Sequence, residues 1–395
     1  MKKIVLIVIA LALGLSINAQ DSNKNEIFKP TIKINGRIQY DFAFIKATDD
    51  DTDEVDWFNG NEFRRAYLSA KGKIGKKLGY KAEIEFAGGG VAYRDFYISY
   101  DAGKAGKIAF GSMAEATGLN MATSSKYTTF MERSVLTSFQ NFRWQAGFHY
   151  MNYNLFDSGV TFQASYTNDN GSKGGDGFKN ATLENAMGFT ARTTYAYILD
   201  KEKHNFVHLG VNYDNRPGGN VKFRPENHMG VSKYDLGFGA SEGRSDIGLE
   251  LATNFGPLSI QGEYKMHSNE MPDKTYNANV YYAFVSYFIT GEHRPYKKGT
   301  FGRVKPKNDV DNGGMGALEI AIRYAGVNSD EKKGSFKIND DVTFSDLDGL
   351  SNITLGVNWY LNSHARVMYN TVLTDLNGTN GEKQVAHMFR VAVDF

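Results

Sequence analysis

The sequence ends with QVAHMFRVAVDF, residues 384–395, in which apolar and polar side chains alternate. One face of an extended chain here would carry Val385, His387, Phe389, Val391, Val393 and Phe395, and the other would carry Gln384, Met388, Arg390 and Asp394. Successive side chains of a strand point to opposite faces, so one face can meet lipid while the other meets a polar lumen. The stretch therefore predicts a membrane-spanning β-strand. An edge strand of a soluble sheet would alternate in the same way, so the rest of the chain has to decide.

The other end of the chain predicts export. Lys2 and Lys3 precede an apolar run, residues 4–15, and Ala19 then provides a small residue at a cleavage position. This pattern is typical of a secretory signal peptide, residues 1–19, removed after Ala19. The run is too short to cross a bilayer as a helix, which takes about 20 residues, and no comparable run follows it.

Composition favours a barrel over a helical membrane protein. The chain has no cysteine, which excludes disulfides, thiolate metal sites and a cysteine nucleophile. It has 42 glycines, 27 phenylalanines and 23 tyrosines but 7 prolines, as expected for many strands, many turns and aromatic girdles. Its mean hydropathy is negative, which suits a barrel because only alternate residues of each strand face lipid. A formal net charge of +1 gives no indication of a nucleic-acid partner.

The same alternation recurs along the chain and predicts an all-β fold. We expect a transmembrane antiparallel β-barrel of about 16 strands, formed as one domain by residues 20–395. The predicted strands are residues 31–44, 65–74, 80–86, 91–101, 107–111, 142–153, 160–168, 187–199, 206–215, 246–254, 258–268, 279–290, 316–325, 352–361, 365–374 and 384–395.

The connections between these strands fall into two kinds. Residues 47–60, 168–179, 216–243 and 293–316 are long and polar, and we expect them to be extracellular loops. The acidic run at 49–56 could bind calcium, but it lacks the glycine and terminal glutamate of an EF-hand, so a solvated loop is the favoured interpretation. Residues 113–141 carry several apolar side chains. Because apolar side chains favour burial, we expect this third loop to fold into the lumen.

Several blocks of sequence carry a family resemblance. EFRRAYLSAKGK at 62–73, YKAE at 80–83, RDFYISY at 94–100 and TSSKYTTFMERS at 123–134 resemble the amino-terminal part of the phosphate-selective porin O and P family. Residues 223–226, 261–264, 290–294, 316–319 and 357–362 are similar to its carboxy-terminal blocks. The blocks occur in order across nearly the whole chain after residue 19.

The resemblance implies an outer-membrane barrel of 16 strands, commonly a homotrimer, with a constriction at the third loop and a basic lumen that passes anions, phosphate or polyphosphate above all. A constriction removes water from an ion, so fixed cations and hydroxyl donors have to replace its hydration. By resemblance, Lys126 with Ser124 and Ser125 is expected at the constriction. The expected basic ladder consists of Arg37, Arg65, Lys71, Lys73, Arg94, Arg133 and Arg323.

Alternatives to this interpretation stay open. Carboxylates share the polar faces of the strands and could neutralise the basic residues: Asp41, Glu83, Glu85, Glu263 and Glu319. A weakly selective diffusion porin for small polar solutes is therefore an alternative, and each inward basic residue could instead brace the wall in an ion pair. A barrel-embedded hydrolase is a second alternative, although no catalytic constellation is recognisable. We expect no catalytic residues, no metal site, no cofactor and no nucleic-acid partner, and expect outer-membrane lipid and lipopolysaccharide around the barrel.

Overall fold

The computed structural model describes residues 28–49, 54–140, 144–168, 187–218, 221–229, 233–237, 241–332, 334–338, 342–377 and 383–395. The predicted signal peptide at 1–19 lies outside the described residues. So does all of the expected loop at 168–179 except its first residue. None of the described helices is long and apolar enough to cross a membrane.

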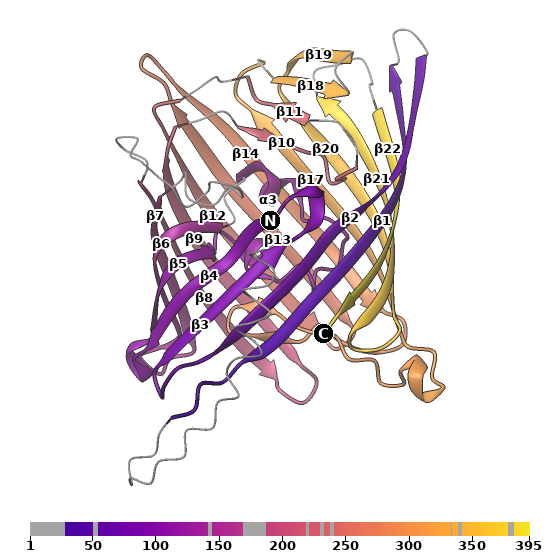
Figure 1. Ribbon diagram of the computed structural model, residues 1–395. Coiled ribbons are helices and arrows are strands. Elements are labelled where there is room, and N and C mark those ends of the chain that lie inside the picture. The colour runs from indigo at the N-terminus through magenta and orange to yellow at the C-terminus, as the bar shows by residue number, and fades with distance from the viewer. Residues whose placement is uncertain are drawn as a thin grey trace.

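In the described part of the chain, sixteen antiparallel strands close into one barrel (Figure 1). Each of them overlaps one predicted strand, so the predicted fold class is confirmed. The strands are β1 (Lys33–Asp49), β2 (Glu54–Lys73), β3 (Leu78–Glu85), β4 (Ala92–Asp101), β5 (Lys107–Ala114), β6 (Trp144–Leu155), β7 (Val160–Asn168), β8 (Met187–Asp200), β9 (Asn205–Pro217), β12 (Gly243–Phe255), β13 (Leu258–Glu270), β14 (Thr275–Phe288), β17 (Ala317–Ser329), β20 (Gly349–Tyr360), β21 (Ala365–Asn377) and β22 (Lys383–Asp394).

The first and last strands close the barrel. β1 pairs with β22 from Arg37 opposite Asp394 to Thr48 opposite Lys383. Gly36 extends this pairing, since it exchanges two backbone hydrogen bonds with the carboxy-terminal residue Phe395. A Cβ atom on residue 36 would lie 2.3 Å from the Phe395 ring, so any larger residue there would displace the terminal aromatic ring.

The two faces of the strands are as predicted. On β1, Ile38, Phe42 and Phe44 remain between 43% and 53% exposed on the outside, whereas Gln39 and Asp41 are buried in the interior. Outward apolar and inward polar side chains are what a lipid-facing wall needs. The barrel is therefore built for a membrane.

One predicted loop proves to be mostly strand. The acidic residues 47–60 were expected to form a long connection, but β1 and β2 continue through them as a paired hairpin, with Thr48 opposite Val55 and Asp49 opposite Glu54. Between these strands, residues 50–53 lie outside the described part. The prediction was wrong because strands were assigned from apolar alternation. The paired strands of a hairpin are held by backbone hydrogen bonds, which do not require that alternation.

A second correction concerns residues 293–316, which were expected on the extracellular side. They connect β14 and β17, the twelfth and thirteenth barrel strands. They therefore lie at the end of the barrel where β1 begins and β22 ends (Figure 1). The connection contains β15 (Tyr296–Lys297), β16 (Thr300–Phe301) and the short helix η3 (Val310–Asn312). Loop length was the wrong criterion here. Antiparallel strands alternate in direction, so the number of strands that precede a connection decides at which end of the barrel it lies.

Two long connections meet at the opposite end. β10 (Lys222–Phe223) and β11 (Lys233–Asp235) join β18 (Gly334–Ile338) and β19 (Val342–Leu347) in a small four-stranded sheet. The sequence had indicated a loop at 216–243 and no element between β17 and β20, so these four short strands were not predicted. The short helices η1 (Ala87–Gly89) and η2 (Gly103–Ala105) occupy two further connections.

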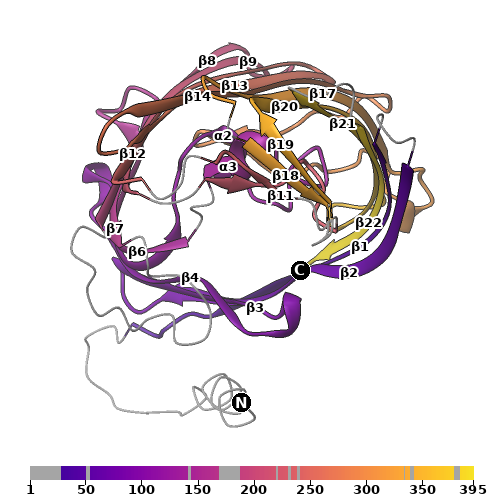
Figure 2. The ribbon, with the colours of Figure 1, turned by 90° about the horizontal axis from the view of Figure 1, so that it is seen from above.

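The connection between β5 and β6, which the sequence had indicated as the third loop, lies inside the barrel (Figure 2). Residues 115–140 contain α2 (Leu119–Ala122) and α3 (Val135–Gln140), which Figure 2 shows within the ring of strands and nearer to β14 and β17 than to β3 and β4. One apolar cluster joins this segment to the small sheet and to the inner face of the wall: Phe130, Val135, Leu136, Phe139, Phe223, Tyr234, Val280, Tyr282, Phe284, Val327 and Leu350. Burial of this apolar surface stabilises the segment against one side of the lumen.

Ion pairs fasten the segment to the wall. Glu132 accepts two hydrogen bonds from Arg64 and one from Arg390, each of 2.8 Å, and lies 3.6 Å from Arg65. Arg390 also donates to both oxygens of Asp41, at 2.7 and 2.6 Å. Burial alone raises the pKa of Glu132, but the three guanidinium groups outweigh it and hold that pKa well below its usual range. This stabilisation is therefore present at neutral pH and is lost only as the pH falls through the depressed value.

A β-bulge brings two adjacent arginines to this carboxylate. The register of β1 and β2 shifts so that Gln39 faces Arg65 and Tyr40 faces Phe63, which leaves Arg64 without an opposite residue. Consecutive side chains of a regular strand point to opposite faces, whereas a bulge re-aims one of them. Arg64 and Arg65 consequently both point into the lumen.

We predict that an arginine on the outer face of β1 destabilises the barrel according to its depth. Ile38→Arg lies midway along the apolar face and should cost roughly 2 to 4 kcal/mol, whereas Ile34→Arg near the end should cost roughly 0 to 1 kcal/mol. Both side chains are exposed to similar extents, at 43% and 47%. Urea unfolding in lipid vesicles measures the difference. Equal costs at the two depths would show that this face does not meet lipid.

We predict that Glu132→Gln weakens the attachment of residues 115–140 to the barrel wall. The substitution takes the charged acceptor from Arg64 and Arg65, while Arg390 keeps Asp41. The free energy of unfolding should fall by roughly 3 kcal/mol, as for other broken buried pairs. Lys104→Met is the matched control, because its ion pair with Asp157 is solvated, with side chains 88% and 60% exposed. An exposed pair contributes about 0 to 1 kcal/mol. The account fails here if the two variants are equally stable in urea unfolding.

Candidate constriction and pore lining

Lys126 lies in a turn that follows α2. The Tyr127 backbone N–H donates to the Ser124 carbonyl at 2.8 Å, and the Lys126 N–H points at the Ser124 hydroxyl at 3.4 Å. The Ser125 carbonyl accepts a 3.1 Å hydrogen bond from Gln39 on β1. These contacts attach the turn to the wall and leave the Lys126 side chain 21% exposed.

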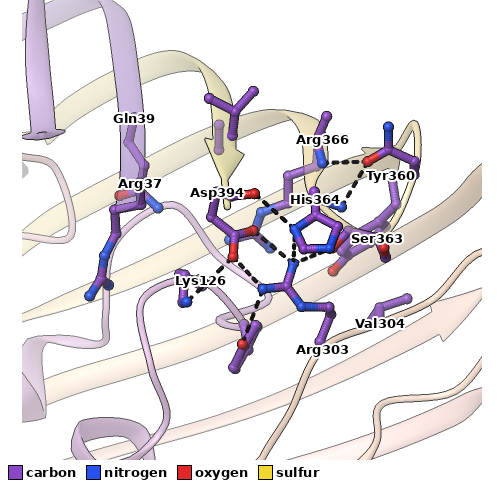
Figure 3. Close-up of a pocket in the computed structure, with 15 residues that line it drawn as sticks. Arg37, Gln39, Lys126, Arg303, Val304, Tyr360, Ser363, His364, Arg366 and Asp394 are labelled. Atoms are coloured by element: carbon purple, nitrogen blue, oxygen red, sulfur yellow. Dashed lines mark hydrogen bonds and ion pairs between the residues drawn. The ribbon is translucent and has the colours of Figure 1, made fainter. Parts of the chain in front are cut away.

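The Lys126 side chain points into a small cavity at the end of the barrel where β22 finishes (Figure 3). Its Nζ lies 3.4 Å from the carboxylate of Asp394 and 5.6 Å from the centre of the Tyr127 ring. The cavity measures about 30 Å³, which is room for about one or two waters. Four cationic side chains line it: Arg37, Lys126, Arg303 and Arg366. Asp394 is the one carboxylate among the described residues of this lining.

Arg37 connects this cavity to the strand wall. Its guanidinium donates to the Ser125 hydroxyl at 2.6 Å, lies 3.4 Å from Glu83 and covers the Tyr67 ring at 4.2 Å. The hydroxyl of Ser125 is thus turned toward a cation. Lys126 and Ser125 were expected at the constriction and Arg37 in the basic ladder. In the structure Arg37 contacts Ser125 and lines the same cavity as Lys126.

Two loop cations differ in how strongly they hold their protons. Burial lowers the pKa of Lys126, and the neighbouring Asp394 opposes that shift only in part. For Arg303, burial also lowers the pKa, but hydrogen bonds to Asp394 and attraction from Tyr127 raise it above its usual value. Lys126 is therefore the cation of this pair that can lose its charge.

Four other predicted residues form structural contacts. Arg65 donates to Gln39 at 2.8 Å, and Arg323 donates to Glu226 at 2.8 Å. Arg133 donates to two backbone carbonyls of its own segment, at 2.8 and 2.7 Å. Arg94 pairs with Glu85 and covers the Trp144 ring at 4.4 Å. The structure places these side chains apart from the Lys126 cavity, along the wall and in the inner segment.

Lys71 and Lys73 line a second and wider cavity. It has a volume of about 380 Å³ at the same end of the barrel and is bordered by β1 to β5. Five lysines line it: Lys33, Lys71, Lys73, Lys77 and Lys107. Asp101, the one carboxylate among its described lining residues, accepts a hydrogen bond from its own turn at 2.9 Å. This end of the barrel thus presents a basic vestibule to solvent.

Sequence reasoning missed several charged groups. Arg64 was hidden by the bulge, since simple alternation assigns it to the outer face. Arg303 belongs to a connection that was expected at the other end. Asp394 was placed on the polar face of its strand, but its partners come from segments far apart in the chain. No group of three or more potential metal ligands occurs in the part of the chain that the structure describes.

Comparison with known proteins gives two curated relatives. The chain is 27% identical to Porin O of Pseudomonas aeruginosa over 408 residues, which covers 89% of this chain and 85% of that protein. It is also 27% identical over 312 residues to an uncharacterized protein of Caulobacter vibrioides. That match covers 74% of this chain but spans 60% of the relative's length.

Solved structures share the fold. An anion-selective porin from Comamonas acidovorans superimposes with a TM-score of 0.55 at 13% identity, covering 93% of this chain and 100% of that one. The family model for phosphate-selective porin O and P matches residues 32–393, which include every barrel strand except the last residue of β22, Asp394. The chain belongs to the phosphate-selective porin O and P family, and it is a β-barrel of the outer membrane.

Proposed function

We propose that this porin is a passive diffusion channel that favours small anions, phosphate or polyphosphate among them. The observation that carries the proposal is the Lys126 cavity, in which four cations face one carboxylate. An anion that binds beside these cations sheds part of its water, and fixed donors have to replace that hydration. Lys126 supplies a point charge, Arg37 supplies a planar fork, and Ser125 supplies a hydroxyl.

The basic vestibule supports the same direction of selectivity. Its five lysines raise the local concentration of anions next to the constriction, because the electrostatic potentials of charges of one sign that line a cleft add together. It lies at the periplasmic end, because that end carries the last residue of the barrel. The relative from Comamonas acidovorans is described as anion-selective, which agrees with the proposal for this chain.

A weakly selective porin for small polar solutes remains the second candidate. It is favoured by the wall formed by β1, β3 and β4, where basic and acidic side chains neutralise each other: Arg37 lies 3.4 Å from Glu83, Lys81 lies 2.6 Å from Asp95, and Arg94 pairs with Glu85. The family assignment favours either channel over the hydrolase alternative. The reversal potential in a salt gradient separates the two channels, because a neutralised wall gives little preference for either ion.

We propose that the porin assembles as a homotrimer, and two short strands support this proposal. β3 and β5 have eight residues each, whereas a strand that crosses the membrane needs about 9 to 11. Their outward aromatic residues are therefore expected to be covered by neighbouring copies rather than by lipid alone. We further propose that residues 1–19 act as a cleavable signal peptide, and that the remaining outer wall contacts lipid and lipopolysaccharide.

We predict that Lys126→Glu shifts selectivity toward cations. The variant should retain a folded barrel, because a partly exposed lumen residue contributes little to stability. In planar bilayers its reversal potential should move toward the cation value, and the phosphate concentration that half-blocks chloride current should rise roughly fivefold or more. Lys104→Glu is the control, since it makes the same charge reversal on a side chain that is 88% exposed. Equal shifts in both variants would remove Lys126 from the permeation path.

We also predict that raising the pH weakens anion preference. A lysine is charged below its pKa, and burial places the pKa of Lys126 below the ordinary lysine value. Its charge should therefore be lost before that of exposed lysines as the pH rises. Lys126→Arg keeps the charge throughout, so the wild type should lose anion preference at lower pH than this variant. Superimposable pH profiles would contradict the assignment.

A further inference from the structure

The second-to-last residue of the chain, Asp394, occupies a central place in the Lys126 cavity. It lies on β22 opposite Arg37 of β1, and its carboxylate turns into the cavity (Figure 3). One oxygen accepts a 2.8 Å hydrogen bond from Arg303. The other oxygen accepts from Arg303 as well and lies 3.4 Å from Lys126. The Asp394 carboxylate is thus shared between Lys126, which belongs to the inner segment at 115–140, and Arg303, which belongs to the connection between β14 and β17.

The two cations depend on Asp394 to different degrees. Arg303 also donates to the Ser363 carbonyl and lies 3.2 Å from His364 and 3.4 Å from the Tyr127 hydroxyl. Among the described residues, Asp394 is the carboxylate that pairs with Lys126. Removal of the Asp394 charge would therefore leave Arg303 in place while it frees Lys126.

An anion that passes through this cavity needs the same donors that Asp394 occupies. The Asp394 side chain is 11% exposed, and the side chains of Lys126 and Arg303 are each 21% exposed. The pair is therefore reached by solvent but only partly screened by it. Conduction requires binding that is favourable enough for entry and weak enough for release. A fixed carboxylate inside a cationic site weakens anion binding and so favours release.

We propose that Asp394 is a specificity-determining residue, an internal anion that competes with the permeating anion for Lys126 and Arg303. The inference rests on the proposed anion channel and goes beyond it. It assigns the retention of anions in the pore to a residue of the last strand and to the periplasmic connection that carries Arg303. The charge of Asp394 limits how strongly the channel holds an anion.

The test uses Asp394→Asn in planar bilayers with the full-length trimer. The reversal potential in a potassium chloride gradient should move further toward the anion value, and the inorganic phosphate concentration that half-blocks chloride current should fall roughly fivefold. Asp157→Asn is the control, because it removes the same charge at the same end from an ion pair with side chains 88% and 60% exposed. An Asp394→Asn channel with the control's potential and phosphate block would overturn the inference.

A coupled variant shows whether the effect runs through Lys126. In a Lys126→Met background, Asp394→Asn should change phosphate block much less than it does in the wild type. An undiminished effect would mean that Asp394 acts on the pore as a general charge. Wild-type selectivity is measured first, so a wild type without anion preference rejects the proposed function separately, while the shift between variants still tests Asp394.

Arg303→Met keeps the inference testable if Asp394→Asn, which neighbours the terminal Phe395, does not assemble. Without Arg303, Asp394 is left to pair with Lys126 alone, so phosphate block should weaken by more than the loss of one charge predicts. Lys305→Met removes the same charge from an exposed residue of the same connection. Equal phosphate block in these two variants would overturn the inference.

Discussion

The attachment of residues 115–140 to the barrel wall is the interaction on which the rest of the interior depends. Glu132 draws together Arg64, Arg65 and Arg390 from β2 and β22. A buried carboxylate with these partners tolerates little displacement, because each uncompensated charge would be costly. The segment is therefore held against the wall by charge on one side and by the apolar cluster around Phe130 and Phe139 on the other. Its tip, with Lys126, reaches the end of the barrel where β22 finishes.

This attachment divides the lumen unequally. Apolar and fully buried polar side chains fill the side along β13 to β21, as Figure 2 shows for the position of α3. The partly exposed charged pairs lie along β1, β3 and β4, and the lysine vestibule opens at the ends of these strands. A solute path would thus run beside the short-stranded part of the wall. The charges along that path, rather than the net charge of the chain, set its selectivity.

The sequence was sufficient for the wall and insufficient for the contacts across the lumen. Alternation around Ile38 and around the last strand placed each face correctly, because the period of a strand is fixed by its backbone. The resemblance at residues 123–134 pointed to Lys126 and Ser125, and strand alternation pointed to Arg37. In the structure Arg37 donates a hydrogen bond to Ser125 and lines the same cavity as Lys126. Arg64 escaped because a single bulge reverses the alternation. The shared carboxylate of Asp394 could not be foreseen, since Lys126, Arg303 and Asp394 meet only after the barrel has closed. The end at which residues 293–316 lie could have been deduced by counting strands.

The central claim is that fixed cations at the constriction select for anions. The most direct test is the zero-current potential of the wild-type channel in a potassium chloride gradient, followed by addition of inorganic phosphate to both sides. The account predicts a potential of the sign given by chloride permeation, together with a reduction of the chloride current by phosphate. A potential near zero or of the cation sign, with no effect of phosphate, would contradict it.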